Sequence, residues 1–315
     1  MDQNTAVMVK AGTIAVILSF FLYKMTATTT LFIIPLLFVS PKFTNTKWAL
    51  IPVVVVLIAL VGSQLYTYGK LSSEIPLTGV LAVGLYLPVT LLIGAFIWIA
   101  FSKRQAFERL LMASVVAGLF GFILAAWIMG NSVSANATRL LYKQTVMQML
   151  PVLFGEGLPL GLTEEGIFTA ILNLLRCGFL PLFVGQFGLS IAVSEQLINR
   201  FDLEFQNKLA NWSLNEVTVW PFLASLGGVL FTLFVRVTIL ETIFWNLALT
   251  MILLYMVQGL SIIATLIRRK NPHVSTFRVF ILALFMIFIP GINVLPLIAL
   301  PLLGVSETWI NFRKN

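Results

Sequence analysis

Apolar stretches long enough to cross a lipid bilayer recur along the whole chain, and this recurrence limits the possible folds more than any other feature. A hydrocarbon core about 30 Å thick requires about 20 apolar residues in a helix to span it. Hydrophobic residues make up 59% of the chain and charged residues only 10%, a balance outside the range of soluble domains. Within lipid, a helix satisfies its own backbone hydrogen bonds. The sequence therefore predicts an all-α, polytopic transmembrane helical bundle.

We expect eight or nine membrane segments in a single integral membrane domain, residues 1–315. Apolar segments occur near residues 7–24, 29–40, 48–66, 75–101, 110–129, 167–194, 217–234, 240–267 and 276–305. The second segment is short and contains Pro35, and the last is interrupted at Pro290 and Pro296. Proline removes a backbone donor and kinks a helix. One or two of the segments are therefore expected to be short or broken helices.

The last segment, 276–305, has two interpretations that stay open at this stage. It is either one kinked span or a hairpin that re-enters from the side on which it began. Most Lys and Arg residues lie on one side if the N-terminus is cytoplasmic, in agreement with the positive-inside rule. A hairpin would add Arg313 and Lys314 to that same side. Charge thus favours the hairpin, while the length of the segment permits a single span.

Two connecting stretches are expected to be amphipathic helices that lie on the membrane surface. Near 197–208, apolar residues fall at positions i, i+1, i+4 and i+8 from Leu197, and charged residues occupy the other faces. The stretch near 139–153 mixes Lys143 and Gln144 with leucine and methionine. Both patterns are typical of interfacial helices.

The composition argues against several classes of function. Cys177 is the only cysteine and His273 the only histidine, so a disulfide and a transition-metal site are not expected. We find no catalytic motif and no glycine-rich phosphate loop, and nothing in the sequence argues for an enzyme or a cofactor. The net charge of +8 comes from residues at helix ends. Membrane lipid is therefore the expected partner, and nucleic acid is not.

Arg176 and Asn173 are candidate solute-binding residues in the segment 167–194. An ionisable residue inside a membrane segment is costly and often marks a functional site. The alternative is that Arg176 extends to the outer headgroups or pairs with a nearby carboxylate such as Glu164 or Glu165. Under the first interpretation, the guanidinium would bind the carboxylate or phosphate of a solute.

The broken last segment supplies three further solute-binding candidates, Pro290, Gly291 and Asn293. Short or Gly- and Pro-interrupted spans often mark the binding site of a transporter, because unwound backbone can coordinate a solute. A plain proline kink is the alternative.

Two further groups of residues have expected roles in contacts. Gly178, Gly185 and Gly188 form a small-residue stripe that suits helix packing. The second group is basic, follows the segment 240–267 and suits anionic lipid headgroups, although a topology determinant explains it equally well. Its members are Arg268, Arg269, Lys270 and Arg278.

Short motifs in the last third carry a family resemblance. They are Tyr255-Met-Val-Gln258-Gly259-Leu-Ser-Ile, Arg268-Arg-Lys270, Phe277-Arg278, Ile289-Pro290-Gly291-Ile-Asn293-Val and Trp309-Ile-Asn-Phe312-Arg313-Lys314. Together they resemble the C-terminal signature of the YybS-like family of bacterial polytopic membrane proteins, over about residues 200–315. The resemblance implies a multi-pass protein of the bacterial cytoplasmic (inner) membrane. That family is distantly similar to the substrate-binding subunits of energy-coupling-factor transporters, which bind a small solute between helices and depend on a separate ATPase.

Three functions remain open on the sequence. The leading one is a transport-related membrane protein that binds a small solute between helices and needs partner subunits, such as another membrane protein or an ATPase. The first alternative is an accessory or scaffold protein that binds lipid or another membrane protein. A lipid-modifying enzyme is the weakest alternative, because no motif supports it. The sequence predicts no oligomeric state.

Overall fold

The computed structural model describes residues 3–25, 28–70, 77–154, 163–199, 202–289 and 291–313, and every regular element in these ranges is a helix. Among the described residues, seven helices are long and apolar enough to cross a membrane. Shorter apolar helices cover Thr29–Lys42, Thr276–Ile287 and Val294–Ser306. These findings confirm the prediction of a polytopic helical bundle that includes short or broken segments.

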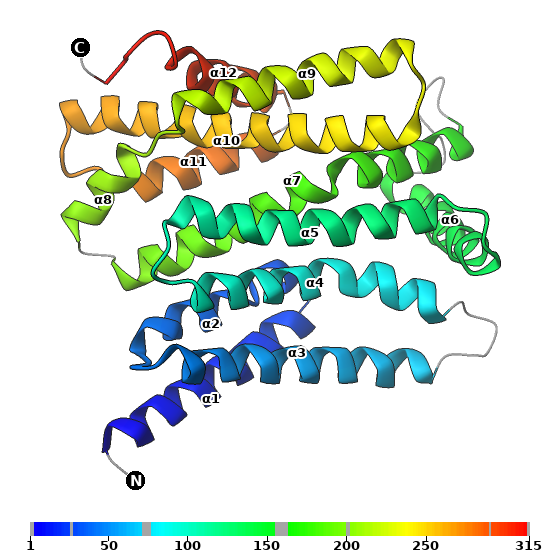
Figure 1. Ribbon diagram of the computed structural model, residues 1–315, viewed down its shortest axis with the longest axis horizontal. Coiled ribbons are helices and arrows are strands. Elements are labelled where there is room, and N and C mark those ends of the chain that lie inside the picture. Colours follow the sequence, from blue (N-terminus) through cyan, green and yellow to red (C-terminus); the bar gives the residue numbers. More distant parts are fainter. Residues whose placement is uncertain are drawn as a thin grey trace. The chain divides into compact units, whose positions relative to one another are not determined.

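Contacts divide the chain into two compact units, Met1–Ser194 and Glu195–Asn315. Among its described residues, the first unit contains six α-helices and most of a seventh, which Figure 1 labels. They are α1 (Gln3–Lys24), α2 (Ile34–Val39), α3 (Thr46–Gly69), α4 (Leu77–Ala100), α5 (Ala106–Ile128), α6 (Val133–Phe154) and α7 (Glu164–Ile198).

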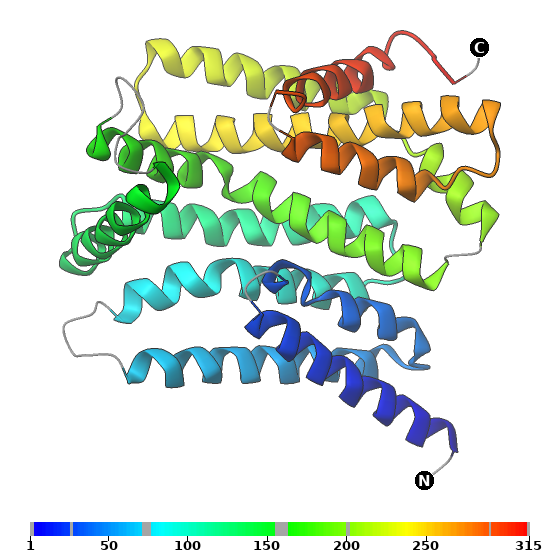
Figure 2. The ribbon, with the colours of Figure 1, turned by 180° about the vertical axis from the view of Figure 1, so that it is seen from behind.

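Two antiparallel pairs, α3 with α4 and α4 with α5, form the middle of the first unit (Figures 1 and 2). α3 begins where Asn45 caps it, because the Asn45 side chain accepts a hydrogen bond of 3.0 Å from the backbone N–H of Lys47. Such a cap satisfies one of the backbone donors that a helix start leaves unpaired. α3 and α4 continue through Pro52 and Pro88, so neither proline ends a membrane segment.

Aromatic rings of α7 pack against α4. The rings of Phe183 and Phe187 stack at 5.4 Å, and the Phe187 ring meets the Trp98 ring edge-on at 6.1 Å. Gly94 of α4 makes room for them, since a Cβ at that position would lie 3.1 Å from the Phe187 ring. The glycine in α4 therefore lets two large rings of α7 approach the α4 backbone.

In the part of the second unit that the structure describes, the end of α7 is followed by five further α-helices. They are α8 (Leu203–Ala210), α9 (Val219–Phe234), α10 (Thr238–Lys270), α11 (Thr276–Phe288) and α12 (Val294–Ser306). α9 and α10 are antiparallel neighbours (Figures 1 and 2). α10 and α12 touch through their backbones: a Cβ on Gly259 would overlap the carbonyl oxygen of Leu300, and a Cβ on Gly304 would overlap that of Tyr255.

The last apolar segment is divided into α11 and α12, each too short to span a bilayer as a straight helix. Between them Gly291 has a φ of +87°, a conformation that glycine adopts without strain. α11 begins beside Arg268, whose NH1 lies 3.3 Å from the Thr276 hydroxyl. After α12 the chain returns to the neighbouring Arg269, whose NH2 donates to the carbonyl of Arg313. α12 itself ends beside Tyr255, in the middle of α10. The residues that follow α12 then bring Arg313 to the end of α10 at which α11 begins, in agreement with the hairpin interpretation.

The boundaries near the expected interfacial helix 197–208 differ from the prediction. α7 continues to Ile198, and α8 begins only after Asp202, whose side chain accepts a hydrogen bond of 2.8 Å from the N–H of Glu204. The Asp202 cap starts a new helix, so the apolar pattern from Leu197 belongs to two elements. The other stretch, 139–153, lies within α6, which is not among the seven candidate spans.

Candidate functional site

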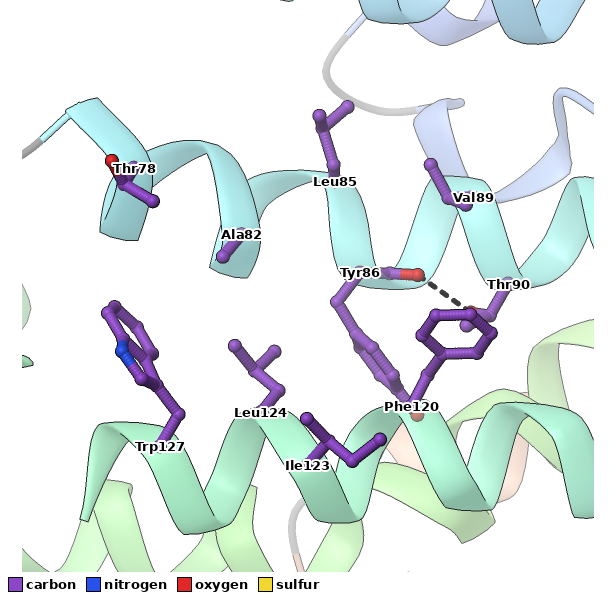
Figure 3. Close-up of a pocket in the computed structure, with 10 residues that line it drawn as sticks. All are labelled: Thr78, Ala82, Leu85, Tyr86, Val89, Thr90, Phe120, Ile123, Leu124 and Trp127. Atoms are coloured by element: carbon purple, nitrogen blue, oxygen red, sulfur yellow. Dashed lines mark hydrogen bonds between the residues drawn. The ribbon is translucent and has the colours of Figure 1, made fainter. Parts of the chain in front are cut away.

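A groove lies between α4 and α5 in the first unit (Figure 3). Its volume is about 410 Å³, within the range usual for small-molecule sites. Tyr86 of α4 points toward α5, and Leu124 and Trp127 of α5 point toward α4, whereas Leu85 and Val89 are directed away from α5 (Figure 3). The lining residues are Thr78, Ala82, Leu85, Tyr86, Val89 and Thr90 of α4 and Phe120, Ile123, Leu124 and Trp127 of α5.

The wall of the groove is apolar, because two of its hydroxyl groups already bond to backbone. The Tyr86 hydroxyl donates to the carbonyl of Ala117 at 3.1 Å. The Thr90 hydroxyl donates to the carbonyl of Tyr86 at 2.8 Å (Figure 3). A strongly polar solute would lose its water here and gain few hydrogen bonds in return, which is unfavourable.

One end of the groove differs from the rest. Thr78 lies in the first turn of α4 and Trp127 in the last turn of α5, where membrane helices reach the lipid–water interface and tryptophan is common. Farther along, Phe120 and Ile123 are 51% and 65% exposed, so the groove opens outward. The arrangement suits an amphipathic molecule with its apolar part along α4 and its polar end near Thr78.

Tyr86 separates the groove from α7. Its ring meets the Phe179 ring of α7 edge-on, with the centroids 6.2 Å apart. Gly121 of α5 admits Phe179, since a Cβ there would overlap the Phe179 ring. The position of the inner wall of the groove is therefore set by packing against α7.

The first pair of sequence-predicted candidates lies on α7. Asn173 is exposed, whereas Arg176 is buried, with 7% of its surface exposed. Glu165 pairs with Lys143 of α6 at 3.0 Å, and about 17 Å of helix separates position 165 from Arg176 at 1.5 Å per residue. Neither Asn173 nor Arg176 lines the groove. Their role in solute binding stays a prediction.

The second set of candidates lies in the other unit. Gly291 is exposed in the turn before α12, and Asn293 is half-buried at the start of that helix. Pro290 lies outside the described residues. Because Asn173 and Arg176 belong to the first unit and Gly291 and Asn293 to the second, no site within one unit contains all of these candidates.

The small-residue stripe of α7 makes no close helix contact at two of its three positions. A Cβ at Gly178 or Gly188 would meet no described atom within 4 Å, and Gly185 is half-buried. Contact between the backbones of two helices occurs at Gly259 and Gly304 of the second unit. The packing role of the stripe stays a prediction.

The four basic candidates after α10 have different surroundings. Arg268 is half-buried and donates to the side chain of Asn207 at 2.6 Å. Arg269 is exposed and donates to the carbonyl of Arg313. Lys270 and Arg278 are both exposed. The structure thus divides the cluster into residues that brace the second unit and residues that are available at its surface.

Sequence reasoning missed a buried polar cluster in the second unit. The Gln258 side chain donates to Glu307 at 3.0 Å and accepts from the N–H of Leu214 at 3.0 Å. Arg313 also bonds to Glu307 and donates to the carbonyl of Trp212 at 2.8 Å. Gln258 and Arg313 belong to the motifs quoted above, but the sequence contained no signal that these distant positions meet. The cluster ties the C-terminal segment to α10.

Potential metal ligands are dispersed within the described ranges. No group of three or more His, Cys, Asp or Glu side chains among those residues could hold a metal ion.

The fold defines a class, the polytopic helical membrane proteins, since seven described helices can span a bilayer. The chain belongs to the family described as "Predicted membrane protein (DUF2232)", whose model matches residues 11–304. No curated protein and no solved structure matches the chain.

Proposed function

We propose that this membrane protein binds a small amphipathic or apolar molecule in the groove between α4 and α5, and that this binding serves a transport-related role. The groove of about 410 Å³ is the observation that supports the proposal. Its lining extends from Thr78 to Thr90, about 18 Å of helix at 1.5 Å per residue. That length suits an extended apolar chain better than a compact polar solute.

The resemblance of residues 200–315 to the YybS-like family supports the same proposal. Through that family the chain is similar to solute-binding subunits that work with a separate ATPase. We therefore propose that a partner ATPase or another membrane subunit supplies the energy for transport. Membranes solubilised in mild detergent should then yield the full chain together with a stoichiometric partner.

A bacterial inner membrane and a cytoplasmic N-terminus complete the proposal. The return of the chain from α12 to Arg269 supports the arrangement in which Arg313 joins the more basic side. That distribution agrees with the positive-inside rule.

The binding proposal can be tested with a long-chain fatty acid that carries a photoactivatable diazirine. The detergent-solubilised full chain is labelled, and the labelled peptides are identified by mass spectrometry. We expect saturable labelling of the α4 and α5 peptides that unlabelled fatty acid suppresses. The Ala82→Phe variant fills the groove and should lose this saturable labelling.

A matched variant controls for general effects of a larger side chain. Ala126 lies in α5, the other helix of the groove, but it is exposed and does not line the groove, so Ala126→Phe should retain saturable labelling. Labelling that does not saturate, or that spreads evenly over the exposed faces of α1 and α3, would show only the general affinity of the probe for apolar surfaces. The proposal would then be wrong.

A second candidate function is an accessory protein that binds lipid. The exposed cations Lys270 and Arg278 at the end of α10 and the start of α11 favour it.

A further inference from the structure

The end of α10 and the start of α11 form a corner, defined here by residues Arg268 to Arg278. Arg268 holds this corner together. Its NH1 lies 3.3 Å from both the carbonyl of Val274 and the hydroxyl of Thr276, and its NH2 donates to Asn207 of α8 at 2.6 Å. A guanidinium with three such partners is fixed in place and is not available to an outside ligand.

Hydrogen bonds to α8 also stabilise this corner. The N–H of Thr276 donates to the Gln206 side chain at 3.0 Å, and the Thr276 hydroxyl donates to the Gln206 carbonyl at 2.9 Å. The Thr265 hydroxyl of α10 donates to the carbonyl of Ala210 at 2.8 Å. These bonds join α8, α10 and α11, so the exposed side chains of the corner project from a braced backbone.

Lys270 and Arg278 are exposed on this braced corner, together with His273. Within the described ranges no carboxylate lies within 4.0 Å of Lys270 or Arg278. The nearby acidic residues are already engaged: Glu204 pairs with Lys208 at 2.8 Å, and Asp202 caps α8. The two cations therefore carry positive charge that the described protein does not neutralise.

Exposed apolar residues show where the corner lies relative to lipid. On α10, Leu266 and Ile267 are 41% and 38% exposed directly before the cations. On α11, Leu282 and Phe285 are both 64% exposed, beginning one turn after Arg278. On both helices the cations thus border an apolar surface that suits acyl chains, and such a border is the level of the lipid headgroups.

We propose that Lys270 and Arg278 bind the phosphate of an anionic phospholipid headgroup, while Arg268 only positions the corner. The apolar residues beside the two cations favour a lipid over a free anion, because the acyl chains of a lipid would cover Leu266 and Ile267. A juxtamembrane cation attracts an anionic headgroup with an energy equivalent to about a fivefold change in affinity.

The test measures the affinity of the full chain in detergent for phosphatidylglycerol, counted as lipid bound in native mass spectrometry. We expect the double variant Lys270→Gln, Arg278→Gln to bind this lipid at least tenfold more weakly, at an unchanged unfolding temperature. Phosphatidylcholine, which has no net charge, should bind weakly to the wild type. Inorganic phosphate should not displace phosphatidylglycerol.

The matched control is the double variant Arg104→Gln, Lys208→Gln. It also removes two exposed cations, but Glu108 and Glu204 already neutralise them, so the affinity should fall less than twofold. Arg268→Gln should lower the unfolding temperature instead, because it removes the brace. The proposal is overturned if the Lys270, Arg278 variant binds like the wild type, if the control loses as much affinity, if phosphatidylcholine binds equally well, or if free phosphate competes.

Discussion

Arg313 and Glu307 form an ion pair that is almost buried, with their side chains 12% and 10% exposed. The Arg313 Nε lies 2.8 Å from Oε1 of Glu307, but its N–H is not aligned with a described acceptor. This contact is therefore an electrostatic attraction and not a hydrogen bond. The directed hydrogen bond runs from NH2 of Arg313 to Oε2 of Glu307 at 3.1 Å. The pair holds the C-terminal segment against the polar cluster of Gln258 and Trp212.

Removing one member of this pair should destabilise the second unit. Glu307→Gln leaves the Arg313 charge buried without its counter-charge. Removing one partner of a buried ion pair lowers the free energy of unfolding by about 3 kcal/mol. We expect a lower unfolding temperature of the detergent-solubilised chain. The double variant Glu307→Gln, Arg313→Gln should lose less than the sum of the two single variants. Additive losses would contradict a direct coupling between the two side chains.

The backbone contact of α10 with α12 predicts a strong effect of a single methyl group. Gly259→Ala places a Cβ against the Leu300 carbonyl, and overpacking of this kind costs about 1–3 kcal/mol. Thermal unfolding should show the loss, although alanine favours a helix over glycine. Gly227→Ala in α9 is the control, because its Cβ would meet no described atom within 4 Å. An equal stability of the two variants would argue against the contact.

Arg176 is expected to matter for stability, because it is 7% exposed in α7. Arg176→Leu removes a buried charged side chain that interacts with its surroundings, and substitutions of this kind cost about 0.5–3 kcal/mol. Asn173→Ala, at an exposed position of the same helix, should leave the unfolding temperature within experimental error. Neither residue lines the groove, so saturable fatty-acid labelling should persist in Asn173→Ala. Loss of labelling in that variant would point back to a solute site on α7.

The hairpin of α11 and α12 predicts that the α10–α11 corner and the C-terminal segment lie on the same side of the membrane. His273 and Ile310 are both exposed, and each can be replaced by cysteine after Cys177→Ser removes the native thiol. We expect a membrane-impermeant maleimide to label both His273→Cys and Ile310→Cys only after cell lysis. Labelling of one position and not the other in intact cells would contradict the hairpin.

The groove could not have been predicted from the sequence. In the segment 75–101, Ala82 and Leu85 belong to an apolar run in which every face of the helix is apolar. Which of these residues face α5 depends on how the two helices pack. The same holds for the contact of Gln258 with Glu307, 49 positions apart in the chain, since no local pattern relates them.

The sequence by itself determined the class of fold, because apolar helices of membrane length have no other stable arrangement in lipid. The Pro290-Gly291 pair in the sequence also indicated where the last segment breaks. In the structure Gly291 takes a positive φ there, which glycine adopts at no steric cost. Only the tertiary structure decided that Arg268 is a brace and Lys270 a surface charge. Both residues are cations in one short run, and their roles differ only through the partners that α8 and α11 bring to Arg268.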